Sequence, residues 1–277
     1  MSSSANLTFS SLIISLPSLT SKALTYKVKS KSMLLSDIKK RALKLVGELS
    51  LVDFGFALPY TWVLVEGPEG RALGVAMTMP EEIQRYVNSI EEPSLETFIE
   101  KADSINIIER TLGIAAINAV SQYYIDLSNA EFVDVLDVIP GNVEKVALIG
   151  NMPPLSKALR ARGFEVFVFE RNAKLWDRDT YSDALEYHLL PEMDVVIASA
   201  SSLVNGTIDM LLDRAKRAEL FVLTGPTGQL LPEFLKETRV THLASMKVHD
   251  ISRALLGLKL GSFKGFEKGN QKYVIEV

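Results

Sequence analysis

The sequence predicts an α/β protein: a Rossmann-like domain with a parallel sheet, preceded by a small α+β domain. Two observations lead to this prediction. After Gly141, short and nearly continuous apolar runs alternate with helical stretches, which is typical of parallel strands buried on both faces. Before Gly141, strand-like runs with hairpin punctuation lie between two helical stretches. We therefore expect a small domain over residues 33–140 and a Rossmann-like domain over residues 141–277.

The small domain begins with a helical pattern from Ser36, whose side chain is placed to cap the amino end. Within residues 93–124, apolar residues recur at positions 105, 108, 112, 115, 116 and 119, which is a helical stripe with Ser104 as a plausible cap. Between these two helices the sequence GPEG indicates a tight hairpin. An antiparallel meander is therefore expected, with strands in residues 49–58, 60–67 and 71–79.

The second domain alternates strand and helix patterns. Helical patterns follow the first and third apolar runs, in residues 153–163 and 207–218, as right-handed crossover connections require. The expected strands are KVALIG, EVFVFE, DVVIAS, ELFVLTG and VTHLASM, in residues 145–150, 165–170, 194–199, 219–225 and 240–246.

The first 32 residues differ from the rest, because they are rich in Ser and Thr and contain no acidic residue. A secretory signal is disfavoured, since the apolar stretch FSSLIISLPSL precedes the first lysine. An organelle transit peptide suits the missing acids but normally carries arginine. We expect residues 1–32 to be a disordered extension or a misassigned start, with Met33 opening the compact protein.

Composition excludes several classes of function. The chain has 277 residues and no cysteine, so disulfides, zinc ribbons, iron–sulfur clusters and thiol nucleophiles are ruled out. A net charge of −4 with scattered Lys and Arg disfavours nucleic acid as a partner. No apolar run approaches the ~20 residues needed to cross a membrane. We expect a cytoplasmic protein, and the sequence leaves a homo-oligomer open.

The loop after the first predicted strand lacks a glycine fingerprint for dinucleotides. Pro153 and Pro154 remove two backbone N–H groups from the turn that would hold phosphate, although they suit the first turn of a helix. Glu170 ends the second strand, where an acid that binds a ribose would stand. It is equally consistent with a helix cap or a pair with Arg171.

The loop after the third strand is the better candidate site. Its hydroxyls can donate hydrogen bonds, and Gly206 allows a ligand to approach the backbone just before a helix, where an anion is favoured. The alternative is that Asn205 and Thr207 only cap that helix. The loop after the fourth strand is a tight turn from Gly225 to Gly228 with one hydroxyl, Thr227. The candidate ligand-binding residues of the third loop are Ser199, Ser201, Ser202, Asn205, Gly206 and Thr207.

Metal and nucleophile motifs are absent. The three histidines, His188, His242 and His249, include no pair four residues apart. No G-x-S-x-G elbow surrounds the serines. Asn118 lies in a mostly apolar helix, where its side chain must find a partner or face a cleft. Hard oxygen ligands are available, although their spacing singles out no metal: Asp177, Asp179, Asp183 and Asp250.

Four ordered motifs, TLGIAAINA, DVVIASASSLVNGTIDMLL, TGPTGQLLPE and LASMKVHD, resemble the putative heavy-metal chelation family. The likeness covers roughly residues 33–262. It implies an enolase-amino-terminal-like domain packed on a Rossmann-like domain, with the site in the cleft between them. Where the family tends to have Thr-Gly-Ser-Thr, this chain has Ser-Ala-Ser-Ser. The matching residues are Gly113 and Asn118, Ser199, Ser201, Ser202, Asn205, Gly206 and Thr207, Gly225, Pro226 and Thr227, and Asp250.

We therefore predict a small-molecule-binding protein that holds an anionic metabolite or a metal chelate in an interdomain cleft. Hydroxyls of the third loop would bind the ligand, Asn118 would orient it, and Asp250 is the predicted acid or base if the protein is an enzyme. Because cysteine is absent, a soft metal is expected to arrive already held by a small chelator. The alternatives are a transferase that binds adenosylmethionine or a nucleotide through Glu170, and a non-catalytic assembly subunit.

Overall fold

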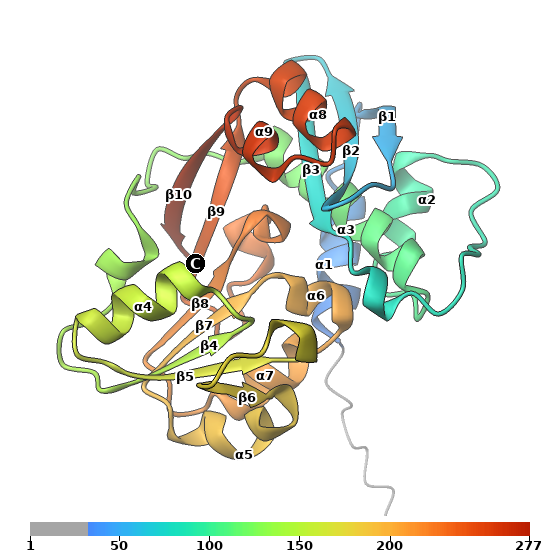
Figure 1. Cartoon of the computed structure of the whole chain (residues 1–277). Coiled ribbons are helices and arrows are strands. Elements are labelled where there is room, and N and C mark those ends of the chain that lie inside the picture. Colours follow the sequence, from blue (N-terminus) through green and yellow to red (C-terminus); the bar gives the residue numbers. More distant parts are fainter. Residues whose placement is uncertain (1–32) are drawn as a thin grey trace, which may run out of the picture. The chain divides into compact units, whose positions relative to one another are not determined.

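The computed structural model describes residues 33–277 and contains two β-sheets (Figure 1). The predictions for residues 1–32 lie outside the described residues. The first part of the chain comprises α1 (Leu34–Leu43), β1 (Ser50–Gly55), β2 (Tyr60–Gly67), β3 (Gly70–Met77), the 3-10 turn η1 (Pro80–Glu82), α2 (Leu95–Glu100), α3 (Ile107–Tyr124) and η2 (Val135–Val138).

The remainder contains all strands of the larger sheet and the helices that connect them. In chain order these elements are β4 (Lys145–Ile149), α4 (Pro153–Ala161), β5 (Glu165–Glu170), η3 (Ala173–Leu175), β6 (Thr180–Ser182), η4 (Asp183–Leu185), α5 (Glu186–Leu189), η5 (Leu190–Glu192), β7 (Val195–Ser199), α6 (Ser201–Asn205), α7 (Ile208–Arg214), β8 (Leu220–Thr224), η6 (Pro226–Gly228), η7 (Pro232–Phe234), β9 (His242–Val248), α8 (Ile251–Lys259), α9 (Phe263–Glu267) and β10 (Asn270–Glu276).

The smaller sheet is the predicted antiparallel meander, in the order β1-β2-β3. Gly67 pairs with Gly70, which confirms the hairpin at GPEG. Side chains of β2 alternate between two covered faces: Val63 and Val65 pack with the core that includes α3, whereas Trp62 and Leu64 pack against α8 and α9. Both faces are covered, so β2 is apolar at nearly every position.

Helix α3 lies unusually close to β3. A Cβ atom on Gly74 would be 2.0 Å from the backbone nitrogen of Ala119, so only glycine fits at this position. The long helix predicted in this region is confirmed as α3, but the residue that caps its N-terminus is not the predicted one. Asn106, not Ser104, accepts hydrogen bonds from the first N–H groups of α3.

The larger sheet has seven strands in the order β10-β9-β8-β7-β4-β5-β6, and all neighbours are parallel except β10 and β9. The five predicted strands are present. The short β6 and the antiparallel edge strand β10 were not predicted. Pro153 and Pro154 occupy the first turn of α4, as expected. The fold class is therefore mixed α/β, with a large, mostly parallel sheet and a small antiparallel one.

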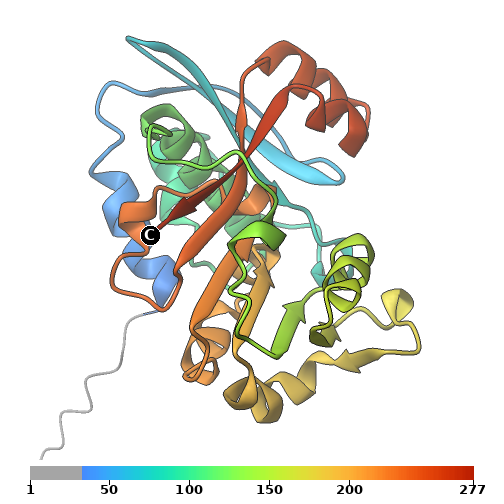
Figure 2. The same ribbon diagram turned by 90° about the vertical axis from the view of Figure 1, so that its left-hand side faces the viewer.

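Strands β9 and β10 extend beyond the other strands of the larger sheet toward α8 and α9 (Figure 2). Met246 and Val248 of β9 pack there with residues of β2 and β3. One cluster of buried apolar side chains also contains residues from both predicted domains, including Leu112 of α3 and Leu203 of α6. The two sheets are thus joined by shared packing, and the boundary near Pro140 stays a prediction. No helix within residues 33–277 is both long and apolar enough to cross a membrane.

Candidate functional site

The winding of the larger sheet reverses between β4 and β7. From β4 the chain proceeds to β5 and β6 on one side, and from β7 to β8 and β9 on the other. The carboxyl ends of the two central strands therefore border a crevice, the usual ligand position in such sheets. A cavity of about 60 Å³ lies there, which we call the switch-point pocket; it is lined by Met79, Ile149, Gly150, Phe169, Glu170, Arg171, Asp183, Glu186, Ser199, Ser201, Ser202, Asn205 and Thr207.

The serines reach this pocket because β7 continues almost directly into α6. Ser199 ends the strand, and its Oγ lies 2.8 Å from the Oγ of Ser201. Ser202 is only 2% exposed, and its Oγ has no hydrogen-bond partner within residues 33–277. A buried hydroxyl without a partner costs about 1–3 kcal/mol. The Ser202 hydroxyl is therefore available to a ligand or a bound water.

Asn205 and Thr207 form a local turn beside the serines. The Asn205 Oδ1 accepts hydrogen bonds from the backbone N–H and the hydroxyl of Thr207, at 3.1 and 2.8 Å. Its Nδ2 has no partner in the described part of the chain. Gly206 adopts φ +79°, and a Cβ atom there would be 2.9 Å from the Nη1 of Arg110. The positive φ thus favours glycine at this position. Thr207 is the N-cap residue of α7, but no side chain makes a capping hydrogen bond there, so Asn205 and Thr207 form a turn before the helix and not the cap that the sequence left open.

Glu170 already has two backbone partners. Its Oε2 accepts from the N–H of Asn151 at 2.9 Å, and its Oε1 accepts from the N–H of Asn172 at 2.7 Å. The carboxylate therefore ties the loop after β4 to the loop after β5. Each oxygen keeps a second lone pair that can face the pocket.

Arg171 forms a bridge between two acids at the pocket wall. Its Nε donates to Asp183 at 2.8 Å, and its Nη1 donates to Glu82 at 3.0 Å. Burial lowers the pKa of Arg171, but the hydrogen bonds with both carboxylates outweigh that effect and raise it. Because Glu82 comes from η1 and Asp183 from η4, the arginine links the small-sheet region to the Rossmann-like region.

Glu186 is the pocket residue that the sequence did not indicate. It is 3% exposed, and its carboxyl group makes no hydrogen bond or ion pair with the described residues. Burial, assisted by the nearby charge of Asp183, raises the pKa of Glu186 to about 8. Its carboxyl group is therefore mostly protonated at pH 7. Nothing in the pattern EYHLLPE distinguishes Glu186 from an exposed acid. In the sequence, only its closeness to Asp183 could have indicated a place in the pocket.

Two predicted residues lie outside the pocket, where they connect the sheets. Asn118 is fully buried, and its Nδ2 donates to the carbonyls of Val75 and Thr227 at 2.7 and 2.8 Å. The Oγ1 of Thr227 accepts from the N–H of Met77 at 2.9 Å. Gln229 accepts from the N–H of Val75. These three side chains therefore bond the backbone groups on the edge of β3 that has no neighbouring strand. We call Asn118, Thr227 and Gln229 the polar brace.

Gly225 and Asp250 are also separate from the switch-point pocket. Gly225 has φ +104° and borders a different groove together with Ala244 and Val274. Asp250 follows β9 and caps α8, because its Oδ1 accepts from the N–H of Arg253 at 2.9 Å. The structure thus brings together Glu170, Ser199, Ser201, Ser202, Asn205 and Thr207, and leaves Asn118, Gly225, Thr227 and Asp250 elsewhere.

The described residues form no metal centre, and larger hollows than this pocket lie elsewhere on the molecule. Within residues 33–277, no group of three or more His, Asp or Glu side chains is arranged to hold a metal ion. A groove of about 930 Å³ lies along α1 and the end of β10, but its charged lining residues are balanced in sign. That groove is remote from the switch point of the sheet.

Comparison with known proteins identifies the family of the chain. The models of two families with the same description, "Putative heavy-metal chelation", match residues 39–121 and 132–277. The chain belongs to this family. It is 46% identical over 255 residues to an uncharacterized protein of Methanocaldococcus jannaschii, covering 88% of this chain and 98% of that protein.

Two crystal structures of family members, both of unknown function, resemble this one. The protein from Pyrococcus horikoshii is 71% identical, with a TM-score of 0.87 over 88% of this chain and 100% of that one. The protein from Desulfitobacterium hafniense is 19% identical, with a TM-score of 0.65 over 87% of this chain and 99% of that one, and supports the fold alone. The family resemblance predicted from the four motifs is therefore confirmed.

Proposed function

We propose that this member of the heavy-metal chelation family binds a small metal chelate whose metal-bearing end enters the switch-point pocket. The observation that carries the proposal is that two buried polar side chains line one cavity at the switch point. The Ser202 hydroxyl has no hydrogen-bond partner within residues 33–277, and the Glu186 carboxyl makes no hydrogen bond or ion pair with the described residues. Leaving such groups unpaired costs folding free energy. A ligand that accepts and donates hydrogen bonds there would recover it.

The charges around the pocket favour a ligand with a positive centre over a simple anion. The lining contains the carboxylates of Glu170 and Asp183, the carboxyl of Glu186, which is mostly protonated at pH 7, and one base, Arg171. The base is already paired with Asp183 and with Glu82. A free carboxylate or phosphate would thus face uncompensated negative charge, whereas a chelated metal would face acceptors. Of the two ligand classes predicted from the sequence, the metal chelate is the better supported.

A bare metal ion is a poorer fit than a chelate. The chain has no cysteine, and its described residues contain no group of three His, Asp or Glu side chains arranged to hold a metal ion, so no site for a bare ion is formed by these residue types. The hydroxyls of Ser199, Ser201 and Ser202 are better suited to hydrogen bonds with a chelator's oxygens. The metal would then be cargo that a small molecule carries.

Isothermal titration with nickel(II)–citrate, nickel(II) chloride and citrate tests the proposal. The chelate is expected to bind more tightly than either component. At pH 7 binding should release a proton, because a positive centre near Glu186 lowers its pKa from about 8. Titrations in two buffers with different ionisation enthalpies measure that release. Tighter binding of bare nickel, or of citrate without proton release, would contradict the proposal.

Ser202→Ala is the variant that tests the site itself. It removes a hydroxyl that bonds to nothing in the described chain, so the fold should not suffer, while the affinity for the chelate should fall roughly tenfold. Ser121→Ala is the matched control. The Oγ of Ser121 is also buried and without a partner, but it lies on α3 and does not line the pocket.

A further inference from the structure

The switch-point pocket is too small for a whole chelate. A cavity of about 60 Å³ has room for a few waters or one small group, whereas sites for small ligands usually measure about 300–1,000 Å³. A second groove, of about 400 Å³, lies next to it. Asn205 lines both hollows, and the ion pair between Glu82 of the groove and Arg171 of the pocket stands between them. We call this hollow the arginine groove.

We infer that the arginine groove is a subsite for the carboxylate groups of the chelator, which Arg85 and Arg110 bind. This inference rests on the proposed function, and it extends the site to residues that no earlier prediction included. The groove has the size that the pocket lacks, and its charge is opposite to that of the pocket.

The two arginines have donors to spare. Arg85 has no hydrogen bond or ion pair in the described part of the chain. The Nε and Nη1 of Arg110 donate to the carbonyls of Ser104 and Val204 at 2.7 and 3.0 Å, and its Nη2 has no partner among the described residues. These backbone bonds fix the guanidinium in position. Guanidinium groups bind carboxylates with two parallel hydrogen bonds, so a fixed one is well prepared for this ligand.

The groove is positive where the pocket is negative. Its charged lining residues are two bases, Arg85 and Arg110, and one acid, Glu82, which shares the charge of Arg171 with Asp183. The lining of the groove therefore keeps a net positive charge. A chelate with a positive metal centre and negative carboxylates matches this arrangement when its centre faces the pocket and its carboxylates face the groove.

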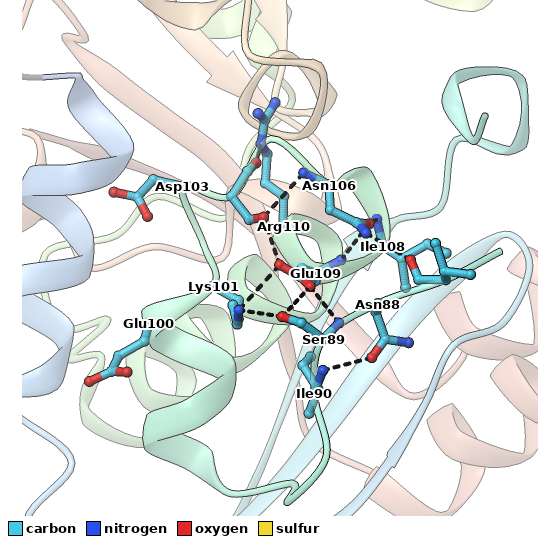
Figure 3. A network of polar contacts seen from close by, with 12 residues as sticks. Asn88, Ser89, Ile90, Glu100, Lys101, Asp103, Asn106, Ile108, Glu109 and Arg110 are labelled. Atoms are coloured by element: carbon cyan, nitrogen blue, oxygen red, sulfur yellow. Dashed lines mark hydrogen bonds and ion pairs between the residues drawn. The ribbon is translucent and has the colours of Figure 1, made fainter. Parts of the chain in front are cut away.

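A hydrogen-bond network around Glu109 holds the wall of the groove (Figure 3). The Oε1 of Glu109 accepts from the backbone N–H and the hydroxyl of Ser89, at 2.7 and 2.8 Å. Asn106 donates from its Nδ2 to the carbonyl of Val87 at 2.7 Å. These contacts fasten the segment around residues 87–89 to the start of α3, and Arg110 extends away from them. The groove is therefore preformed on its inner side, which lowers the cost of binding.

The test is titration of the full chain with nickel(II)–citrate, citrate and inorganic phosphate. Arg85→Ala should weaken binding of nickel(II)–citrate roughly tenfold to a hundredfold, the value of a hydrogen bond to a charged group. Arg178→Ala is the matched control, because Arg178 is exposed, has no partner in the described chain and lines neither hollow. Arg85→Glu should weaken binding further through repulsion.

The outcomes separate this inference from the proposed function. If the chelate binds with equal affinity to the wild type, Arg85→Ala and Arg85→Glu, the subsite is wrong and the pocket proposal stands. If the chelate does not bind the wild type, the proposed function fails for this chelate. In that case the titrations with citrate and with phosphate test the subsite by themselves. Weaker binding of citrate to Arg85→Ala than to the wild type supports a carboxylate subsite. Tighter binding of phosphate than of citrate to the wild type, or no binding of either anion, overturns it.

Discussion

Glu109 and Glu186 are both almost completely buried, at 5% and 3% exposure, yet their pKa values move in opposite directions. Burial raises the pKa of each. At Glu109 hydrogen bonds from Ser104 and Ser89 and the charge of Lys101 outweigh burial, and the pKa falls to about 2. At Glu186 burial is not offset, because no described residue donates a hydrogen bond to the carboxyl group, and nearby Asp183 adds repulsion, so the pKa rises to about 8.

The difference distinguishes a structural acid from one that awaits a partner. Around Glu109 every contact lies within residues 89–109, and the carboxylate fastens one loop to one helix. Around Glu186 the protein supplies burial but no hydrogen bonds. Perturbed groups of the second kind cluster at functional sites, because the missing interactions are reserved for a ligand. Under the proposed function Glu186 is an acid of the second kind, and it lines the switch-point pocket together with Ser202.

The largest expected effect is on stability at Glu186. An acid with a raised pKa keeps its proton in the folded state, while the unfolded chain ionises near pH 4.5. Stability should therefore fall as the pH rises from 4.5 to about 8. Glu186→Gln removes this loss and should be more stable than the wild type above pH 8 by at most roughly 5 kcal/mol. Urea unfolding at pH 4 and pH 9 measures the difference in free energy of unfolding between the variant and the wild type. An equal difference at both pH values would contradict a raised pKa at Glu186.

The opposite pH dependence is expected at Glu109. Its depressed pKa contributes stability above the unfolded value of 4.5, and this stability is lost as the pH falls toward about 2. Glu109→Gln should lose on the order of 3 kcal/mol at pH 7. The deficit should shrink below pH 4 in chemical denaturation experiments. A deficit that persists at low pH would mean that shape, and not charge, matters at this position.

The strands of the larger sheet could be predicted because burial on both faces leaves a direct mark on composition. The runs that became β4, β7 and β8 are apolar at almost every position, since each is covered on both faces. The edge strand β10 was missed because half of its side chains are polar or exposed. The cap at Ser104 was predicted wrongly because its hydroxyl instead donates to Glu109.

Residues of the site could be predicted only where they directly follow an element that the sequence pattern reveals. Ser199, Ser201 and Ser202 follow a recognisable strand directly, so their place at the sheet's edge could be inferred. Glu186 could not, because its burial depends on the packing of short elements that no periodicity reveals. Asn118 was recognised as unusual, but its partners are backbone carbonyls 43 and 109 residues away. Such partners leave no pattern in the sequence.

A substitution in the polar brace is expected to change stability less than the substitutions of Glu186 and Glu109. Thr227→Val keeps the shape of the side chain but removes the acceptor for the N–H of Met77. We expect a loss of about 1–2 kcal/mol in stability, with chelate affinity unchanged. Thermal unfolding and titration of the same sample measure both. Loss of binding without loss of stability would instead support the ligand-binding role predicted for Thr227 from the sequence.

The smallest stability effect is expected at Ser202, and it is the most informative about the pocket. Its Oγ has no partner in the described chain, so Ser202→Ala removes a desolvated hydroxyl and should leave the stability of the ligand-free protein unchanged or slightly higher. With nickel(II)–citrate present, the wild type should gain a higher melting temperature and the variant should gain less, since a ligand stabilises in proportion to its affinity. The two measurements together separate a hydroxyl that serves a ligand from one that serves the fold. A variant that melts lower without ligand would place Ser202 with Glu109 among the structural groups.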